Sequence, residues 1–440
     1  MPQNLSSQQK GTSPRVVIIG AGFGGIACTN KLARNKDLEI ILVDRRNHHL
    51  FQPLLYQVAT STLTAPDIAR SVRSIFRKKD NVQVCYDHVS SVDLENKVIS
   101  LASDAEMHYD YLVIAAGATT SYFGNDQWAQ YTHELKSLSD AFEIRKAVLG
   151  NLELAERSSG GSWEGLRNVV IVGGGPTGVE LAGSFADLLK RIMKRSFRHL
   201  DTQKLRIILV EGQTHLLGAF HEKQGICTRK HLEEIGVEVR TEAMVENISE
   251  NEVTLRGGEV IQAGTIIWAA GVQAAPLTKK LNAPTTRSGQ VIVQPDLNIA
   301  GHEDCYVIGD AAAVELPDGS FVPGVAPAAA QGGLYVGKRI TNLIKGKSPG
   351  KPFSYRDKGK MAIIGKGAAV VDVGGCRING WCGWLVWLFI HVLFLVDFRS
   401  KLAVLINWFW AYIHNAPGSR VFTTASGQDK PDDNTAPKEV

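Results

Sequence analysis

Cysteine is scarce in this chain and is not arranged for metal binding. The sequence has 440 residues and six cysteines, and none of them forms a C-x-x-C pair. The six are Cys28, Cys85, Cys227, Cys305, Cys376 and Cys382. Five residues separate Cys376 from Cys382 and no second pair matches them. This spacing argues against a zinc site, and we expect no metal.

The amino terminus lacks a secretory signal. Residues Met1 to Ser13 are polar and contain no apolar core of the kind that a signal peptide needs. We therefore expect a protein on the cytosolic side of the cell membrane, with reduced thiols.

A strong overall charge is missing as well. The formal net charge of +4 is too small to argue for nucleic acid, and we expect no nucleic-acid partner. The basic residues are nevertheless unevenly spread, because the stretch Lys338–Lys401 holds twelve Lys or Arg against three acids. This basic zone surrounds the most apolar part of the chain, a pairing that favours an anionic membrane surface as partner.

No apolar run reaches the length of an ordinary membrane span. Trp381–Val396 is sixteen residues long, or about 24 Å as a helix, whereas a span needs roughly twenty residues. Leu402–Ile413 is shorter still. We expect a C-terminal membrane-anchoring helical region that lies in one leaflet, so the protein would be peripheral or monotopic on the cytoplasmic face. The alternative for this surface is a buried dimer interface, and a homodimer would suit such an anchor. Five tryptophans are expected at headgroup depth: Trp381, Trp384, Trp387, Trp408 and Trp410.

What the chain does have is a repeated strand–helix–strand pattern. The first copy has apolar runs typical of buried parallel strands on either side of an expected helix. These segments are the strands Arg15–Gly20, Leu38–Val43 and Tyr111–Ala115 and the helix Gly24–Asn35. The second copy consists of the strands Asn168–Val172, Leu205–Val210 and Thr265–Ala269 and a helix through Ile192. The repeat predicts an α/β protein with two Rossmann-like dinucleotide-binding domains.

One further strand, Cys305–Gly309, is expected to rejoin the first domain, so that the second domain is inserted in the first. The predicted FAD-binding domain has two parts, over 14–125 and 286–345, and the predicted NADH-binding domain lies between them, over 126–285. An anchoring region follows over 346–420, and disordered tails are expected over 1–13 and 421–440. We also expect that removing the residues after about Lys345 releases the protein from membranes and leaves FAD bound.

The first copy carries a G-x-G-x-x-G fingerprint, Gly20-Ala21-Gly22-Phe23-Gly24-Gly25. Gly20 allows the tight turn, Gly22 lets the backbone approach a pyrophosphate, and Gly25 lets helix and strand pack closely. The helix N-terminus then offers N–H groups to phosphate. Asp44, which closes the next strand, can accept hydrogen bonds from ribose hydroxyls.

The second copy repeats this arrangement with Gly173, Gly175 and Gly178. Glu211 closes its next strand, where a carboxylate binds the 2′-hydroxyl of NADH and repels the 2′-phosphate of NADPH. No arginine immediately follows Glu211, so we expect NADH.

Asp310 suggests which copy holds which nucleotide. It ends the strand CYVIG just before an expected helix, where a carboxylate can hydrogen-bond a ribityl or ribose hydroxyl; the plainer interpretation is a helix N-cap. We assign FAD to the first copy and NADH to the second.

Several longer segments are similar to the type II NADH dehydrogenases, the non-proton-pumping NADH:quinone oxidoreductases of the two-dinucleotide-binding-domain flavoprotein superfamily. The segments are VDRRNHHLFQPLLYQVAT (Val43–Thr60), GGGPTGVELAG (Gly173–Gly183), YVIGDAA (Tyr306–Ala312), VPGVAPAAAQGG (Val322–Gly333) and the Trp-rich C-terminal region. The resemblance covers about residues 14 to 420. It implies an enzyme that passes hydride from NADH to FAD, and then two electrons to a membrane quinone (ubiquinone or menaquinone), without pumping protons.

The resemblance also implies three catalytic residues. Gln331 matches the last glutamine of a family segment A-Q-x-A-x-Q-x-G that borders flavin and quinone, although Pro327 replaces the first glutamine. Glu180 matches a family acid near flavin and nicotinamide, and Lys366 falls where the family has a basic residue near the flavin ring.

Three rival functions stay open on the sequence. A sulfide:quinone oxidoreductase needs a redox cysteine pair beside the flavin, yet no cysteine lies between Cys85 and Cys227. A soluble ferredoxin-type reductase would not carry the Trp-rich terminus. A non-enzymatic membrane protein that senses NADH would keep both fingerprints without using a quinone.

Overall fold

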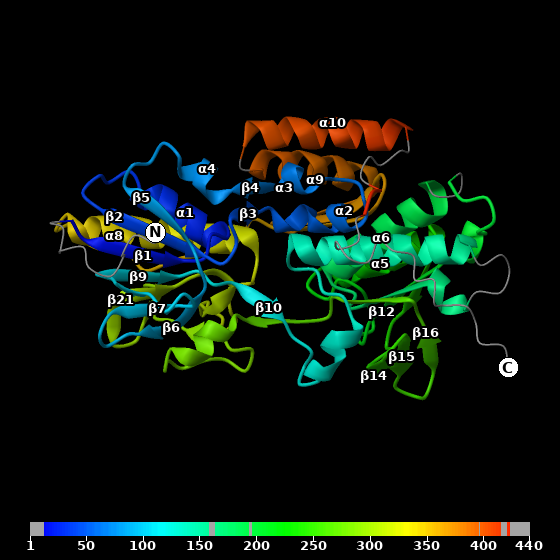
Figure 1. The fold of residues 1–440 in the computed structure, drawn as a ribbon, viewed down its shortest axis with the longest axis horizontal. Coiled ribbons are helices and arrows are strands. Elements are labelled where there is room, and N and C mark those ends of the chain that lie inside the picture. The colour runs from blue at the N-terminus through cyan, green and yellow to red at the C-terminus, as the bar shows by residue number, and fades with distance from the viewer. Residues whose placement is uncertain (1–12, 158–162, 193–195, 396, 415–419, 423–440) are drawn as a thin grey trace.

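The computed structural model describes residues 13–157, 163–192, 196–395, 397–414 and 420–422. Two α/β lobes lie side by side, and two C-terminal helices run along one side of the molecule, at the top in Figure 1. Most of the predicted tails, 1–13 and 421–440, lies outside the described residues.

The first lobe is built on a six-stranded sheet. Its strands, in order across the sheet, are β20 (Asn298–Ile299), β21 (His302–Val307), β9 (Tyr111–Ile114), β1 (Arg15–Ile19), β2 (Glu39–Asp44) and β5 (Val82–Tyr86). All neighbours are parallel except β20 and β21. Val16, Val17 and Ile18 are fully buried, in one core with residues of the flanking helices and of the small antiparallel sheet formed within 89–108. The chain leaves this sheet after β9 and returns to it with β20 and β21.

Helices and small sheets surround this sheet. The helices are α1 (Phe23–Leu32), α2 (Leu55–Ala59), α3 (Ala65–Ile68), α4 (Val72–Phe76) and α8 (Ala326–Ile344), with 3-10 turns η1 (Gln52–Leu54), η7 (Pro276–Lys280) and η8 (Gly309–Ala311). The small sheets pair β3 (His48–Leu50) with β4 (Ala69–Ser71), β6 (Val89–Asp93) with β7 (Val98–Leu101) and β8 (Glu106–His108), and β19 (Val291–Ile292) with β22 (Ala312–Ala313).

The second lobe repeats the parallel arrangement on four strands. They are, in order, β13 (Val237–Arg240), β12 (Arg206–Val210), β11 (Asn168–Val172) and β17 (Thr265–Trp268). One face carries α5 (Leu138–Arg157), α6 (Pro176–Ala186) and α7 (Glu222–Glu234); the other carries the antiparallel sheet β14 (Val245–Ser249), β15 (Glu252–Leu255) and β16 (Val260–Gln262). Short turns η2 (Asp126–Tyr131), η3 (Glu164–Arg167) and η6 (Thr202–Lys204) connect these elements. The α-helix expected through Ile192 ends at Ala186 and continues as a π-helical segment, η4 (Asp187–Ile192).

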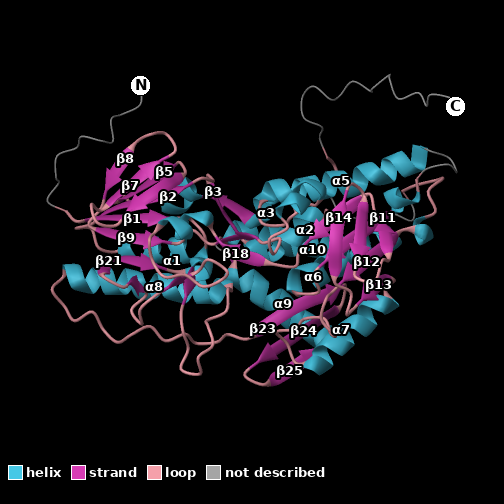
Figure 2. Ribbon diagram, turned by 90° about the horizontal axis from the view of Figure 1, so that it is seen from below, coloured by secondary structure: helices cyan, strands magenta, loops and turns pink. Residues whose placement is uncertain are grey.

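The chain crosses between the lobes twice, and the two crossings pair with each other. Strand β10 (Ala118–Thr120) runs antiparallel to β18 (Val272–Ala274). The two crossings therefore form one short ribbon between the lobes (Figures 1 and 2), which ties the position of one lobe to that of the other.

The sequence predicted a helical anchoring region over 346–420, but the structure shows that this region is not purely helical. It begins with an antiparallel sheet of β23 (Lys360–Gly365), β24 (Ala368–Val373) and β25 (Cys376–Asn379), followed by α9 (Gly380–Phe394) and α10 (Phe398–His414). This sheet lies beside α7 and α9 (Figure 2), and β23 packs on α6. Removing everything after Lys345 would therefore uncover the second lobe, and the expected clean separation of an anchor does not fit this packing.

The two C-terminal helices are docked through buried tryptophans on a core that α2 shares with α5 and α6 of the second lobe. Trp387 is fully buried, Trp408 is 3% exposed, and the Trp408 indole donates to Gln57 Oε1 in α2 at 2.7 Å. The prediction that all five tryptophans lie at headgroup depth is thus wrong for these two, because they fill the core between α9, α10 and α2. Trp381 and Trp410 are exposed.

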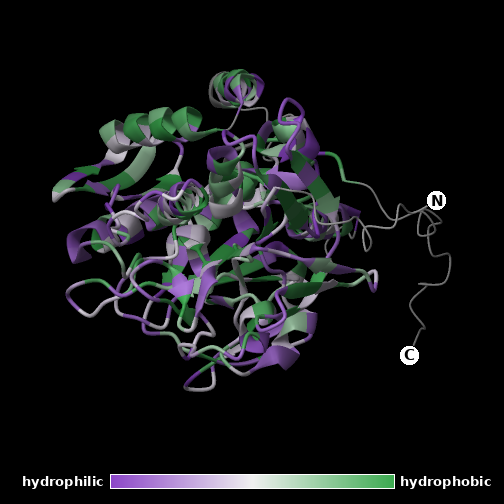
Figure 3. Cartoon of the chain, turned by 90° about the vertical axis from the view of Figure 1, so that its left-hand side faces the viewer, coloured by the Kyte–Doolittle hydropathy of each residue, from purple (hydrophilic) through white to green (hydrophobic). Residues whose placement is uncertain are grey.

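Polar contacts complete this docking. Asn407 donates to Asp67 in α3 at 2.9 Å, and Arg70 Nη2 lies 2.6 Å from Asp397 Oδ2. The outer faces of α9 and α10 carry apolar side chains, and apolar ribbon gathers at the top of the molecule (Figure 3). Within the described residues, no helix combines the length and apolar character that crossing a bilayer requires.

Trp387 offers a test of this packing. Trp387→Ala should lower the free energy of unfolding by about 3–5 kcal/mol, because it leaves a cavity in the core between α9 and α10. The matched Trp381→Ala removes an indole that is 62% exposed and should change stability by less than about 0.5 kcal/mol. Chemical denaturation measures both, and equal effects would contradict the docking described.

Candidate active site

The first glycine turn has the shape that a dinucleotide fingerprint needs. Gly20 has φ +102°, a left-handed conformation that favours glycine. A Cβ on Gly25 would overlap the carbonyl oxygen of Gly20, so α1 can pack on β1 at this distance only with glycine there. A Cβ on Gly22 would meet nothing within 4 Å. The Gly22 backbone therefore faces open space at the N-terminus of α1, where a phosphate group can approach.

The second turn reproduces this geometry residue by residue. Gly173 has φ +112°. A Cβ on Gly178 would overlap the carbonyl oxygen of Gly173, and one on Gly175 would meet nothing within 4 Å. The same three constraints thus act at the N-terminus of α6, and both turns can take a pyrophosphate.

The two acids of the fingerprints also occupy matching places. Asp44 Oδ2 accepts from the Ala21 N–H at 2.5 Å, and Glu211 Oε2 accepts from the Gly174 N–H at 2.6 Å. Each carboxylate therefore reaches the turn of its own lobe, beside the position expected for a ribose. Their other oxygens accept from the backbone N–H groups of Arg46 and Gln213.

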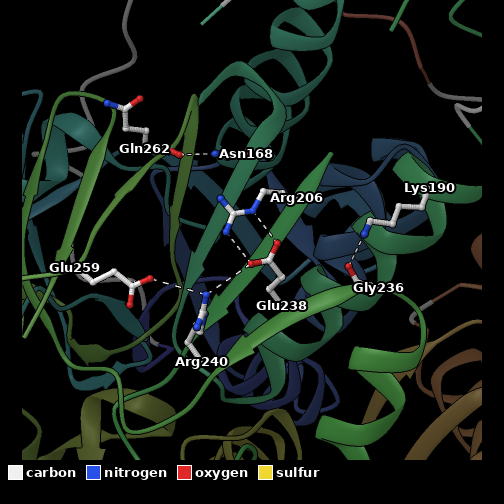
Figure 4. Close-up of polar contacts among 8 residues, drawn as sticks. All are labelled: Asn168, Lys190, Arg206, Gly236, Glu238, Arg240, Glu259 and Gln262. Atoms are coloured by element: carbon white, nitrogen blue, oxygen red, sulfur yellow. Dashed lines mark hydrogen bonds and ion pairs between the residues drawn. The ribbon is translucent and has the colours of Figure 1, made fainter. Parts of the chain in front are cut away.

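An arginine that the sequence did not associate with Glu211 lies on the neighbouring strand. The Glu211 N–H donates to the carbonyl oxygen of Arg240 at 2.8 Å. The Arg240 guanidinium points toward Glu238 Oε2 at 4.0 Å and Glu259 Oε1 at 3.9 Å (Figure 4). Glu238 is also held by Arg206 through a bidentate pair. The spacing of Glu211 and Arg240 along the chain does not predict that they are neighbours in the sheet.

Asp310 lies in the first lobe, where the sequence placed it, but not before a long helix. It sits in the short turn η8, and α8 begins only at Ala326. Within the described residues, its carboxyl group makes no hydrogen bond, and it lines a recess with Gly324 and Ala329. Burial raises the pKa of Asp310, and the charge of Lys136 opposes this.

Lys136 is a residue of this site that sequence reasoning missed. Burial lowers the pKa of Lys136, and the charges of Asp310 and Glu134 oppose that shift. Its carbonyl oxygen accepts from Arg46, two residues after Asp44. The Lys136 backbone thus contacts Arg46 while its side-chain charge acts on Asp310, although Lys136 belongs to a segment far from both in sequence.

Glu180 and Lys366 lie at different points along the packing of β23 on α6. Glu180 is on α6, and the dense packing around its carboxyl raises the pKa of Glu180 well above its ordinary value, against a backbone hydrogen bond from Ile363 in β23. The Lys366 N–H, at the tip of the β23–β24 hairpin, donates to Asp187 Oδ2 just after α6. Glu180 thus contacts β23, whereas the backbone of Lys366 contacts the residue that follows α6.

Gln331 is on α8, and its side chain faces the connection to the C-terminal region. Its amide nitrogen donates to the Arg356 carbonyl and its amide oxygen accepts from the Arg356 N–H, both at 3.0 Å. The amide is thus engaged with the backbone in this arrangement, and its predicted contact to flavin or quinone stays a prediction. Pro327 is in the first turn of the same helix, where proline is well tolerated.

The segment HHLFQPLLYQ connects the first glycine turn to α9. His49 donates from Nδ1 to the carbonyl oxygen of Ala21 at 2.8 Å, and burial lowers the pKa of His49. Phe23 of the turn packs edge-on against His49 and Phe51 at 5.2 and 5.8 Å between ring centroids. Phe51 in turn meets His391 of α9 at 6.3 Å. Aromatic rings thus run from the glycine turn to the C-terminal helices.

Comparison with known proteins places this geometry in context. The family model described as pyridine nucleotide-disulphide oxidoreductase matches residues 14–333. A type II NADH:quinone oxidoreductase of Mycobacterium tuberculosis is 39% identical over 96% of this chain and 93% of its own length.

Two solved structures share the fold. NDH2 from Plasmodium falciparum, in complex with NADH, has a TM-score of 0.85 at 21% identity, over 94% of this chain and 100% of that one. The sulfide:quinone oxidoreductase of Aquifex aeolicus has a TM-score of 0.70 at 18% identity, over 89% of this chain and 92% of that one.

The two open glycines allow a test of each turn. Gly22→Ala and Gly175→Ala both fit the fold without a clash. We expect both variants to fold, with Gly22→Ala purified with less flavin and Gly175→Ala showing a raised KM for NADH, because the methyl group enters the space expected for pyrophosphate. Flavin content and steady-state kinetics measure this. Gly25→Ala is the contrasting variant, and it should fail to fold around its turn. Normal flavin content and KM in both open-glycine variants would contradict the assignment.

Proposed function

Since this chain belongs to the type II NADH:quinone oxidoreductases, within the pyridine nucleotide-disulphide oxidoreductase family, we propose that it oxidises NADH and reduces a membrane quinone with a bound FAD. The observation that carries the proposal is the doubled glycine turn with its acid, found once in each lobe. Together with 39% identity over nearly the whole chain, it supports one resident and one exchanging dinucleotide. The quinone is ubiquinone or menaquinone.

We assign FAD to the first lobe, formed by 14–125 and 286–345. The open Gly22 backbone and the N-terminus of α1 suit its pyrophosphate, and Asp44 suits the adenosine ribose. The carboxyl group of Asp310, which has no hydrogen-bond partner within the described residues, would receive one from the ribityl chain. Lys136 adds a positive charge to this polar path. The residues present therefore fit the group.

We assign NADH to the second lobe, over 126–285. Gly175 leaves room for the pyrophosphate, and Glu211 would accept from the ribose hydroxyls. The carboxylate repels a 2′-phosphate, which favours NADH over NADPH. Arg240 does not offset this repulsion, because Glu238 and Glu259 attract its guanidinium away.

The bound flavin supplies the redox chemistry, taking a hydride from NADH and passing two electrons to the quinone. The chain itself positions the partners and handles protons. Burial raises the pKa of Glu180, which favours the protonated carboxyl group, and Glu180 would deliver this proton where a reduced quinone needs one. Lys366, on the adjoining hairpin, would supply positive charge beside that site, and Gln331 would contact flavin or quinone after release from Arg356.

The alternatives fit the residues less well. Sulfide chemistry needs reactive thiols beside the flavin, yet burial raises the pKa of both Cys28 and Cys305, the two buried cysteines of the first lobe. Such thiols stay protonated and inert. A soluble ferredoxin-type reductase would have no use for the apolar C-terminal face. A membrane protein that only senses NADH is distinguished from the enzyme by the flavin absorbance, which NADH bleaches in the enzyme alone.

We further propose that α9 and α10 rest on the cytoplasmic surface of the cell membrane without crossing it. Their outward side chains include Phe389 (67% exposed), Phe398 (78%) and Phe409 (63%). A face of this kind is typical of a membrane or protein contact, and the basic residues of Lys338–Lys401 suit anionic lipids. The expected homodimer stays a prediction.

A steady-state assay with NADH and a soluble quinone tests the proposed function. Purified, flavin-loaded protein should oxidise NADH only when the quinone is present, at a rate that saturates with both. Absence of quinone reduction in a preparation that contains flavin would overturn the proposal.

Glu211 sets the predicted coenzyme preference. Glu211→Gln should raise the NADPH/NADH ratio of kcat/KM by about tenfold, since removal of one close like charge is worth about 1.4 kcal/mol. Glu246→Gln, an exposed acid that leaves the turn intact, is the matched control. Unchanged discrimination in Glu211→Gln would speak against the ribose role.

The membrane contact predicts a separable effect of the exposed phenylalanines. Phe398→Ser combined with Phe409→Ser should weaken binding to anionic phospholipid vesicles by about tenfold or more, because each ring contributes roughly 1.5 kcal/mol when buried. The melting temperature should not fall. Val260→Ser, in β16 on the opposite side of the molecule (Figure 1), is the control. Undiminished sedimentation with vesicles would reject this surface as the contact.

A further inference from the structure

A phenylalanine occupies an unfavourable backbone conformation in the turn that follows β10. The Asn125 N–H donates to the Tyr122 carbonyl at 3.0 Å, and the two central residues, Phe123 and Gly124, have φ +54° and +93°. A tight turn with two positive φ angles favours Asn, Asp or Gly at its first central position, and a bulky side chain there is an outlier. Even so, the Phe123 side chain is not buried, since it is 67% exposed. Burial in the core therefore does not explain why phenylalanine stands here.

The Phe123 ring contacts Gly271 and Trp268. A Cβ on Gly271 would lie 2.5 Å from Phe123 Cζ, and Gly271 does not have a left-handed backbone that would itself demand glycine. The ring also meets Trp268 edge-on, at 6.3 Å between centroids. The Ser121 N–H donates to the Gly271 carbonyl at 3.1 Å, and the Trp268 indole donates to the Ser121 carbonyl at 2.9 Å. The strained turn is thus fixed against the end of β17.

Gly271 and the Phe123 ring lie beside the second glycine turn. A Cβ on Gly173 would lie 2.6 Å from Ala270 Cα and 2.7 Å from the Ala269 carbonyl carbon, so the residues just before Gly271 pack against the turn. In a parallel sheet, ligands bind beyond the carboxyl ends of the strands. Phe123 holds its exposed ring at this edge of the sheet.

The strand order shows on which side of the second glycine turn the Phe123 ring lies. Strand β11, which leads into the glycine turn, lies between β12 and β17. Glu211 follows β12 on one side, and Gly271 with Phe123 follows β17 on the other. A dinucleotide with its adenosine ribose at Glu211 and its pyrophosphate over Gly174 and Gly175 would extend its other half toward β17.

We propose that Phe123 is a contact residue for the nicotinamide half of NADH, and that the strained turn keeps its ring in place to orient that half for hydride transfer. The inference rests on the proposed function, because it needs NADH in the second lobe. The turn that holds the ring comes three residues after β10, at the end of the ribbon of β10 and β18 that joins the lobes. A rigid aromatic side chain limits the orientations of a bound ring at low entropic cost.

Two substitutions separate this role from a structural one. Phe123→Asn places a residue that the turn prefers and removes the ring, whereas Phe123→Tyr keeps the ring and the strain. Melting temperature is measured with and without NADH. Anaerobic stopped-flow spectroscopy of flavin-loaded protein then gives the limiting rate of flavin reduction by NADH and, separately, the rate of reoxidation by a soluble quinone.

We expect Phe123→Asn to melt no lower than the unaltered protein, to show a smaller NADH-induced rise in melting temperature, and to reduce its flavin about 10- to 100-fold more slowly. Reoxidation by quinone should be unchanged, and Phe123→Tyr should keep the unaltered rates. Flavin reduction at the normal rate in Phe123→Asn would overturn the proposal. So would a lower melting temperature with both half-reactions slowed alike, since the ring would then be only a structural plug. If NADH failed to reduce the flavin of the unaltered protein, the proposed function itself would fail.

Discussion

The arrangement of both lobes depends on one close contact, in which the last fingerprint glycine packs against the carbonyl oxygen of the first. At Gly25 and at Gly178 a single methyl group would overlap that oxygen. This constraint sets how near α1 and α6 lie to their strands, and so where each helix N-terminus and each acid stands. Because the lobes satisfy it in the same way, their carboxyl edges offer two like dinucleotide sites, and the difference between them must come from other residues.

Those other residues come from the contacts between lobes and from the C-terminal region. The first lobe has Asp310 and Lys136, whose charges act on each other. The second turn has Glu211 instead, and Glu180 beside it on α6. The β23 hairpin brings Lys366 to the same helix, and α9 and α10 close the other side through Trp387 and Trp408. A region that resembles an anchor in the sequence is therefore also part of the framework of the site.

Local patterns in the sequence predicted the parts of the fold that depend on neighbours along the chain. The apolar runs at Arg15 and Asn168 form strands, and tight glycine turns follow them, whereas the ribose roles of Asp44 and Glu211 stay predictions. The patterns did not predict the β23–β25 sheet, the short turn after Asp310, or the burial of Trp387 and Trp408. Lys136 and Arg240 were missed for the same physical reason: they reach the site by contacts between distant segments, which spacing does not encode.

The central claim is that one site holds a flavin which the other site's nucleotide reduces. The most direct measurement follows the visible absorbance of the purified protein without oxygen, first on adding NADH and then on adding a soluble quinone. The account predicts that the flavin absorbance is lost with NADH, is little changed by an equal amount of NADPH, and returns with the quinone. Flavin that NADH cannot bleach, or that quinone cannot restore, would contradict it.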